Sequence, residues 1–472
     1  MQIVRTDKGY VSGTLIGEPG KEVSIFRGIP FAAPPVGDLR WKPPQPVVPW
    51  EGIRECTQFS HISPQLVMPG ISGEMPQSED CLYLNVVTPA REPDEKLPVM
   101  VWMHGGGYSG GCGNDRIWNN YRLPQYGVVV VTLNHRLGPI GLLAHPALSK
   151  ESPEGVSGNY LFLDLIASLQ WVRDNIAAFG GDPDNVTIFG ESGGGAKVTI
   201  MMLSPLAEGL FHRAICESGT STAILIGKPL ADIENSGKTL LKNLGIDSAI
   251  DPLEQVRAIP FIEIIKASQE MEGPRTPDSP PAFVWDAAVD GWLLPESPEN
   301  MFKSSPINAV PLIVSANLGE LIGPGPLVIP LLIPAYIDML EAVKKQGCTG
   351  YACIFDQVPA VWRKEGCVSV HSMELPYVFG DWDDSTEWWT SVYMLAQQAG
   401  AKLANPGLGA ADRNASEAMM GLWASFAKTG RPQARRVPDW PEYSANIDKY
   451  LYICDQCEVR TGFSKVVEQI PP

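Results

Sequence analysis

Short apolar runs alternate along this chain with segments whose apolar residues recur at helical spacing. Four runs are dominated by consecutive β-branched and other apolar residues, at 97–107, 127–138, 185–192 and 309–320. Such runs are typical of strands that are covered on both faces. Residues 163–179 have helical spacing and stop at Gly180-Gly181. The alternation predicts an α/β fold, a doubly wound and mostly parallel sheet with helices on both faces, in which reactive groups collect beyond the carboxyl ends of the strands.

This pattern continues without an internal repeat, a low-complexity segment or a Gly/Ser-rich linker, so residues 1–472 are expected to form one domain. The strongest apolar run begins at Leu321 and holds four prolines between positions 324 and 334. Prolines at this density argue against a membrane-spanning helix. They favour a lid or pocket-wall segment over residues 321–345.

The first residues, MQIVRTDKGYVSG, lack the apolar core of a signal peptide and enter strand-like alternation at once. A signal removed before this numbering began would place the protein in a secreted or periplasmic compartment. Without such a signal the location would be cytoplasmic, and the sequence leaves this choice open.

The composition narrows the classes of partner. The chain has 53 acidic and 36 basic residues and a net charge of −17, which repels phosphate backbones and argues against nucleic acid as a partner.

Nine cysteines are an odd number, so at least one has no partner within a monomer. Cys454 and Cys457 form a C-x-x-C, but no second pair has zinc-ligand spacing, and no metal site is predicted.

One serine stands out among glycines, in the segment Gly190-Glu191-Ser192-Gly193-Gly194. A strand-like run precedes it and a segment that can begin a helix follows. G-x-S-x-G in this setting is typical of a nucleophile elbow, in which the tight turn leaves no room for a Cβ at the glycines. An ordinary glycine-rich loop is the alternative.

A serine nucleophile needs a base, and only His212 and His371 follow Ser192 along the chain. In this class of sheet the order is serine, acid, histidine. His212 comes too early to leave room for an acid, so elimination favours His371.

The acid should end a strand between Ser192 and His371. Glu320 closes the run PLIVSANLGE and is favoured on that ground. Asp286 and Asp290 are rivals, although their segment resembles a loop in which they would serve as turn or capping acids. The acid would hold the imidazole tautomer and stabilise the imidazolium.

The segment HGGG at 104–107 ends another strand and matches an oxyanion-hole motif. Gly106, Gly107 and Gly193 would donate their backbone N–H groups to a developing oxyanion. A loop that simply needs positive φ is compatible with this interpretation. His104 is expected to order the loop rather than to transfer protons.

Several motifs in the right order resemble the type-B carboxylesterase/lipase family, which includes cholinesterases and bacterial p-nitrobenzyl esterases. They are FRGIPFAAPPVGDLRWKPP from Phe26, SEDCLYLNVVTP from Ser78, the stretch from Gly158 through FGESGGG, WASFAKTGRP from Trp423 and DWPEY from Asp439. The resemblance covers nearly the whole chain. It implies the α/β-hydrolase fold, with Ser192 as nucleophile, His371 as base and Glu320 as the acid of an N-x-x-E pattern that begins at Asn317.

The resemblance also implies supporting roles. Glu191 would be the elbow glutamate, Ser218 would hydrogen-bond the catalytic acid, and Cys56 would form a disulfide with Cys81. Two buried structural ion pairs are implied as well, Arg40 with Glu79 and Arg136 with Asp164.

The chain departs from the family pattern at Gly193, where relatives often carry alanine, and at Leu321, where glycine is usual. The 51 residues from Glu320 to His371 form a shorter interval than in relatives. We therefore expect a more open pocket with a hydrophobic wall, to which Trp102, Tyr108 and Leu321 could contribute.

These observations predict a serine esterase that acts on a small-molecule ester without a metal or organic cofactor. A non-catalytic adhesion or binding module is one alternative, although such relatives typically lack the nucleophile. Cleavage of a carbamate, amide or thioester is another, because the same acyl-transfer geometry serves all of them.

Overall fold

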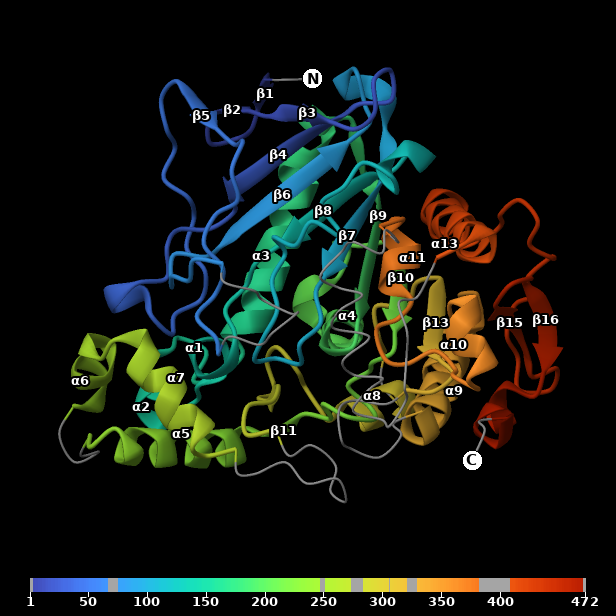
Figure 1. Ribbon diagram of the computed structural model, residues 1–472. Helices are drawn as coiled ribbons and strands as arrows, with labels where there is room; N and C mark the ends of the chain where they lie inside the picture. The colour runs from blue at the N-terminus through green and yellow to red at the C-terminus, as the bar shows by residue number, and fades with distance from the viewer. Residues whose placement is uncertain are drawn as a thin grey trace.

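The computed structural model describes residues 3–66, 75–246, 251–272, 283–304, 306–320, 329–381 and 408–469. Within these ranges a large twisted sheet crosses the molecule, with helices on both sides (Figure 1). Its strands, in spatial order, are β16 (Glu458–Thr461), β15 (Lys449–Ile453), β14 (Gly350–Phe355), β13 (Leu312–Asn317), β10 (Arg213–Glu217), β9 (Gly181–Glu191), β7 (Leu97–Met103), β8 (Val129–Leu133), β6 (Tyr83–Thr88), β4 (Val23–Pro30) and β3 (Thr14–Ile16).

The centre of the sheet, from β15 to β8, is parallel, and the flanking pairs are antiparallel. Glu191 pairs with Glu217, and Glu217 pairs with Ser315, so the carboxyl ends of β9, β10 and β13 lie side by side. The predicted doubly wound α/β sheet is confirmed. Three of the four predicted strand runs contain a whole strand, and the run 185–192 covers only the second part of β9.

The α-helices are α1 (Gly138–Leu142), α2 (Pro146–Glu151), α3 (Tyr160–Asn175), α4 (Gly193–Leu203), α5 (Leu230–Asn243), α6 (Pro252–Ala258), α7 (Phe261–Gln269), α8 (Pro298–Ser304), α9 (Ile329–Lys345), α10 (Ala360–Lys364), α11 (Leu375–Phe379) and α13 (Ala410–Thr429). The helix predicted over 163–179 is α3 together with the 3-10 turn Ile176–Phe179 that follows it. Two small sheets lie outside the main one, formed by β1 (Ile3–Arg5), β2 (Tyr10–Ser12) and β5 (Ile53–Glu55), and by β11 (Lys228–Pro229) and β12 (Ala288–Val289).

Alternation along the central strands divides the core into two faces. On β7, Val101 and Met103 join a cluster with residues of α3, α4 and α9, whereas Trp102 joins a separate cluster with residues of α11 and α13. The ring centroid of Trp102 lies 5.0 Å from that of Phe379. Successive strand residues point to opposite faces, so continuous apolar runs are needed where helices cover both.

Two residues expected at the pocket are core residues instead. Trp102 is buried among the aromatic side chains of the α13 face, and buried Tyr108 hydrogen-bonds Ser221 through its hydroxyl. Leu321, the third, lies outside the described residues.

The segment predicted as a lid or pocket wall is described only from Ile329 onwards. There it forms α9, whose apolar side packs against β13 and β14. The hydroxyl of Tyr336 accepts a hydrogen bond from the N–H of Gly219 at 2.9 Å, which ties the helix to the sheet. This part of the predicted segment is a covering helix of the sheet. Among the described residues no helix combines the length and apolar character that a membrane crossing requires.

Candidate active site

Ser192 occupies the turn between β9 and α4. Its backbone has a φ of 58° and a ψ of −123°, a conformation that an L-residue adopts only when its surroundings enforce it. A Cβ on Gly190 would meet the Met103 carbonyl oxygen at 2.5 Å, and one on Gly194 would meet it at 1.9 Å. The end of β7 therefore requires both glycines of the G-x-S-x-G pattern.

His371 lies in the loop between α10 and α11 and contacts two residues from other strand ends. Its Nε2 is 2.9 Å from Ser192 Oγ, and its Nδ1 is 2.6 Å from Glu320 Oε2. Glu320 stands three residues beyond the end of β13 and is fully buried. The three residues predicted as a triad thus form one hydrogen-bonded chain, although 179 positions separate Ser192 from His371.

The charges around His371 favour its protonated form. Burial lowers the pKa of His371, but the nearby carboxylates of Glu191 and Glu320 outweigh this effect and raise it above the ordinary value. One Glu191 oxygen lies 3.3 Å from the Nε2 of His371 and accepts a hydrogen bond from the Ser372 hydroxyl at 2.5 Å. Glu191 is therefore placed to act electrostatically on His371.

The glycine loop after β7 faces the start of α4. Gly106 and Gly107 have φ values of 83° and 61°, which glycine adopts readily. Within the described part of the chain, no acceptor is hydrogen-bonded to the N–H of either residue. A Cβ on Gly193 would meet the Gly107 carbonyl oxygen at 2.2 Å. Glycine after the nucleophile thus lets the two backbone segments approach each other closely.

A further carboxyl group, that of Glu374, lies behind the three residues predicted as a triad. Glu374 is three residues after His371, and its Oε2 accepts a hydrogen bond from the Asn317 side-chain amide at 2.5 Å. The Asn317 backbone N–H donates to Glu320 Oε1 at 2.6 Å. Burial raises the pKa of Glu374, and the negative charges of Glu191 and Glu320 raise it further. The sequence analysis missed Glu374 and Ser372, although a carboxylate three residues after a candidate base was a usable signal.

The structure corrects the contact expected of Ser218. Its hydroxyl donates to Glu374 Oε1 at 3.0 Å rather than to the acid Glu320, and it accepts from the Asn317 amide at 3.2 Å. Ser218 is thus one bond further from His371 than the resemblance implied. Asn317 links both carboxyl groups and takes the position expected of the serine.

The predicted disulfide is also corrected. Cys56 and Cys81 are both free and buried, as thiols in the structure. Burial raises the pKa of Cys56 to about 11 and that of Cys81 further still, so both stay protonated and unreactive at neutral pH. The two ion pairs are present: Arg136 Nη2 lies 2.7 Å from Asp164 Oδ1, and Arg40 pairs with Glu79.

The rival residues have structural contacts. His212 Nδ1 accepts the Val186 N–H at 3.1 Å, at the entrance to β10 and away from its carboxyl end. Asp290 accepts three backbone N–H groups of the turn that follows it, and Asp286 accepts that of Ala287. Both aspartates therefore stabilise turns.

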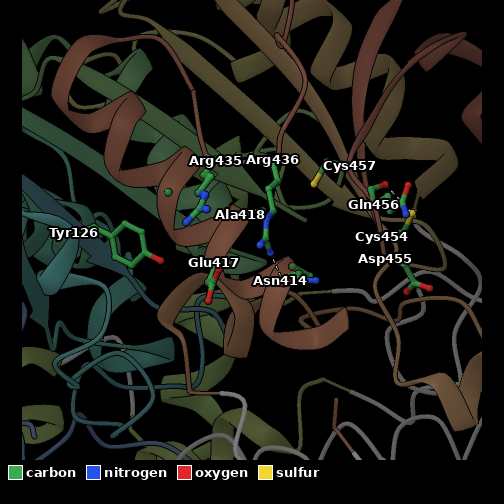
Figure 2. A pocket seen from close by; sticks show the side chains of 12 residues that line it. Tyr126, Asn414, Glu417, Ala418, Arg435, Arg436, Cys454, Asp455, Gln456 and Cys457 are labelled. Carbon is green, nitrogen blue, oxygen red and sulfur yellow. Dashed lines mark hydrogen bonds between the residues drawn. The ribbon is translucent and has the colours of Figure 1, made fainter. Parts of the chain in front are cut away.

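A surface hollow of about 590 Å³ lies between α13 and two C-terminal loops, apart from Ser192, His371 and Glu320 (Figure 2). Arg436 reaches across it to Asn414 at 3.2 Å, and Cys454 and Cys457 border it. No triad or glycine-loop residue lines it. Among the described residues, no group of three or more His, Cys, Asp or Glu side chains is arranged to hold a metal ion.

The chain is similar in sequence and in structure to known esterases. The profile described as "Carboxylesterase family" matches residues 1–325 and 331–468. The chain is 35% identical to Fumonisin B1 esterase of Sphingopyxis macrogoltabida, over 92% of this chain and 83% of that protein. It is 33% identical to Para-nitrobenzyl esterase of Bacillus subtilis (strain 168), over 96% and 94% of the two chains. A solved structure of PNB esterase superposes with a TM-score of 0.80 at 29% identity, over 100% of this chain and 99% of the other.

Proposed function

Because the chain belongs to the carboxylesterase family and is a carboxylic ester hydrolase, we propose that it works through an acyl-enzyme intermediate on Ser192. His371 accepts the hydroxyl proton of Ser192 as its oxygen attacks the ester carbonyl. The resulting oxyanion is stabilised by the N–H groups of Gly106, Gly107 and Gly193. His371 then passes the proton to the departing alcohol.

Water completes the cycle. His371 removes a proton from water as its oxygen attacks the acyl carbon. The second tetrahedral intermediate then collapses while His371 returns this proton to Ser192 Oγ, which releases the carboxylic acid and free Ser192. Glu320 accepts the Nδ1–H of His371 throughout, which fixes the tautomer and stabilises the imidazolium. Apart from the ester and water, these steps use only groups of this chain.

The observation that supports this mechanism is the unbroken chain of contacts from Ser192 Oγ through His371 to Glu320 Oε2, at 2.9 and 2.6 Å. Both distances are within the range for a nucleophile–base pair and for a base held by its acid. The glycine loop beside it provides donors that are not already used by the described part of the chain. A binding module would have no need of this combination.

The neutral imidazole of His371 is the active form, because only it can accept a proton from Ser192. The carboxylates that raise the pKa of His371 therefore move the acidic limb of the activity profile above the ordinary histidine value of 6.5. Activity is lost as the pH falls through that limb and is retained above it.

We propose small-molecule carboxylic esters as the substrate class, since the curated relatives include an esterase named for para-nitrobenzyl esters and one named for fumonisin B1. The test is steady-state hydrolysis of p-nitrophenyl butyrate and of the matching p-nitroanilide. We expect hydrolysis of the ester by the wild-type protein and its loss in Ser192→Ala. Ester turnover at the wild-type rate in Ser192→Ala would overturn the mechanism, and faster cleavage of the anilide would overturn the substrate class.

A further inference from the structure

A lysine is fully buried one turn into the helix that carries the nucleophile. Lys197 follows Gly193 by four residues, so both lie on the same side of α4. Its Nζ donates a hydrogen bond to the carbonyl oxygen of His104 at 2.8 Å. His104 is the first residue of the HGGG loop and is itself fully buried. The side chain thus joins the nucleophile helix to the start of the glycine loop.

This contact connects the two parts of the proposed oxyanion hole. Gly193 belongs to α4, whereas Gly106 and Gly107 belong to the loop after β7. A Cβ on Gly105 would meet a Glu191 side-chain oxygen at 2.9 Å and Ser192 Cβ at 3.4 Å, so the loop lies directly against the elbow. The position of the loop relative to α4 decides whether the donors converge on one point, and Lys197 spans the two elements.

Acidic and neutral titratable groups surround the buried ammonium of Lys197. Burial lowers the pKa of Lys197 to about 7, and the Glu191 carboxylate acts in the opposite direction. Burial, together with the Lys197 charge, lowers the pKa of both His104 and His135 well below the ordinary value, so the two stacked imidazoles are neutral. The titratable groups on the elements packed against this part of α4 are Glu191 at the end of β9, His104 after β7, His135 after β8, and Cys216 and Glu217 on β10.

Burying an ammonium ion is costly unless it is paired and hydrogen-bonded, and an apolar side chain would fill the same space more cheaply. A single protein acceptor, the His104 carbonyl, is bonded to this ammonium within the described residues. The hydrogen bond to the loop and the electrostatic interaction with Glu191 are therefore what the ammonium contributes.

We propose that Lys197 is a positioning residue for ester hydrolysis, which holds the oxyanion-hole loop against α4 through the His104 carbonyl. The charge of Lys197 also favours the ionised form of Glu191. The inference rests on the proposed function, because it needs Ser192 as nucleophile and the loop N–H groups as oxyanion donors. It predicts two separable effects, one from the hydrogen bond and one from the charge.

The two effects are separated by a pair of substitutions. Lys197→Met removes both the donor and the charge, whereas Lys197→Gln retains an N–H donor without the charge. We expect Lys197→Met to lower kcat by about 30- to 100-fold with KM changed by about threefold or less, because the oxyanion contacts strengthen only in the transition state. Lys197→Gln should recover about tenfold in kcat.

The charge effect is measured by the pH dependence of kcat/KM. Burial raises the pKa of Glu191 to about 7, and the Lys197 charge opposes this effect. Without the ammonium, Glu191 therefore takes up a proton more readily, and its carboxylate raises the pKa of His371 less. The acidic limb should therefore move to lower pH in both variants. In a Glu191→Gln background, Lys197→Gln should cause no further shift.

Lys428→Met is the matched control. Lys428 also donates to a backbone carbonyl, that of Tyr126 at 2.5 Å, but it is exposed at the end of α13. This variant should retain wild-type kcat and pH dependence. Far-UV circular dichroism and the Tm verify folding of each variant. If the methionine variant does not fold, the glutamine variant still tests the charge effect.

Wild-type kcat in Lys197→Met, an unshifted acidic limb in Lys197→Gln, or a rise in KM at constant kcat would each overturn the proposal. Failure of the proposed function would look different, since Ser192→Ala would then keep its activity. The two results are read from separate variants.

Discussion

The two sides of Ser192 are built from different kinds of group. On one side the backbone of the glycine loop and the start of α4 approach so closely that a Cβ on Gly193 would lie 2.2 Å from the Gly107 oxygen. On the other side Glu191, Glu320 and Glu374 surround His371 with buried carboxyl groups. The first side depends on the close approach of two backbone segments, which an added Cβ at Gly193 would disturb in this chain. The second works by charge, which acts over several ångströms and depends on pH.

The largest loss of kcat is expected at Ser192 and His371, where the backbone side and the carboxylate side meet. Ser192→Ala and His371→Ala should each lower kcat by about 10⁴-fold or more, and the double variant should lose little beyond either single one, because the two side chains act as one unit. The measurement is kcat on p-nitrophenyl butyrate for all three variants. Additive losses would mean that the hydrogen-bonded pair does not work as a unit.

The backbone side is tested next. Gly193→Ala places a methyl group against the Gly107 carbonyl and should displace the loop, lowering kcat by about 10- to 100-fold while KM stays close to wild type. Gly409→Ala is the matched control, because the nearest atom to its added Cβ is 3.9 Å away. Equal kcat values for the two variants would show that close approach at Gly193 is not needed.

The carboxylate side is tested by pH. Glu191→Gln removes the first of the negative charges that raise the pKa of His371, so less alkaline solution suffices to deprotonate the imidazole. The acidic limb of kcat/KM should move to lower pH by about one unit. The pH profile of the wild-type protein, recorded in the same buffers, is the reference. A shift to higher pH would reverse the assigned role of Glu191.

The smallest change in kcat/KM is expected for Glu374, which does not contact His371 through a hydrogen bond described above. Burial raises the pKa of Glu374, so it carries a proton more readily than an ordinary glutamate, and glutamine resembles its neutral form. Glu374→Gln should change kcat/KM by about threefold or less at neutral pH. A loss comparable with that of Ser192→Ala would place Glu374, rather than Glu320, in the triad.

The sequence predicted what packing alone dictates. Continuous apolar runs located the central strands, because strands covered on both faces have no polar side. The glycines around Ser192 predicted a tight turn, and in the structure the Met103 carbonyl leaves no room for a Cβ there. His371 could be chosen by counting, since only one other histidine follows the nucleophile. These inferences depend on order along the chain, which a sequence displays directly.

Contacts between side chains that are distant in the sequence could not be predicted from it. Asn317 and Glu374 are 57 positions apart, and their bond depends on how the loop with His371 lies against the end of β13. The same limit explains Ser218, which hydrogen-bonds Glu374 and not the predicted Glu320. Cys56 and Cys81 are free thiols in the structure. Their positions in the sequence do not fix the Cβ geometry that a disulfide demands.

In the proposed mechanism, Ser192 Oγ is the atom to which the acyl group is transferred. The most direct measurement is to titrate the protein with diisopropyl fluorophosphate and to follow esterase activity and the site of modification by peptide mass spectrometry. We predict one adduct per chain, on Ser192, with activity lost in proportion to labelling and no adduct in Ser192→Ala. Labelling of a different residue, or full activity in protein whose Ser192 is completely modified, would contradict the account.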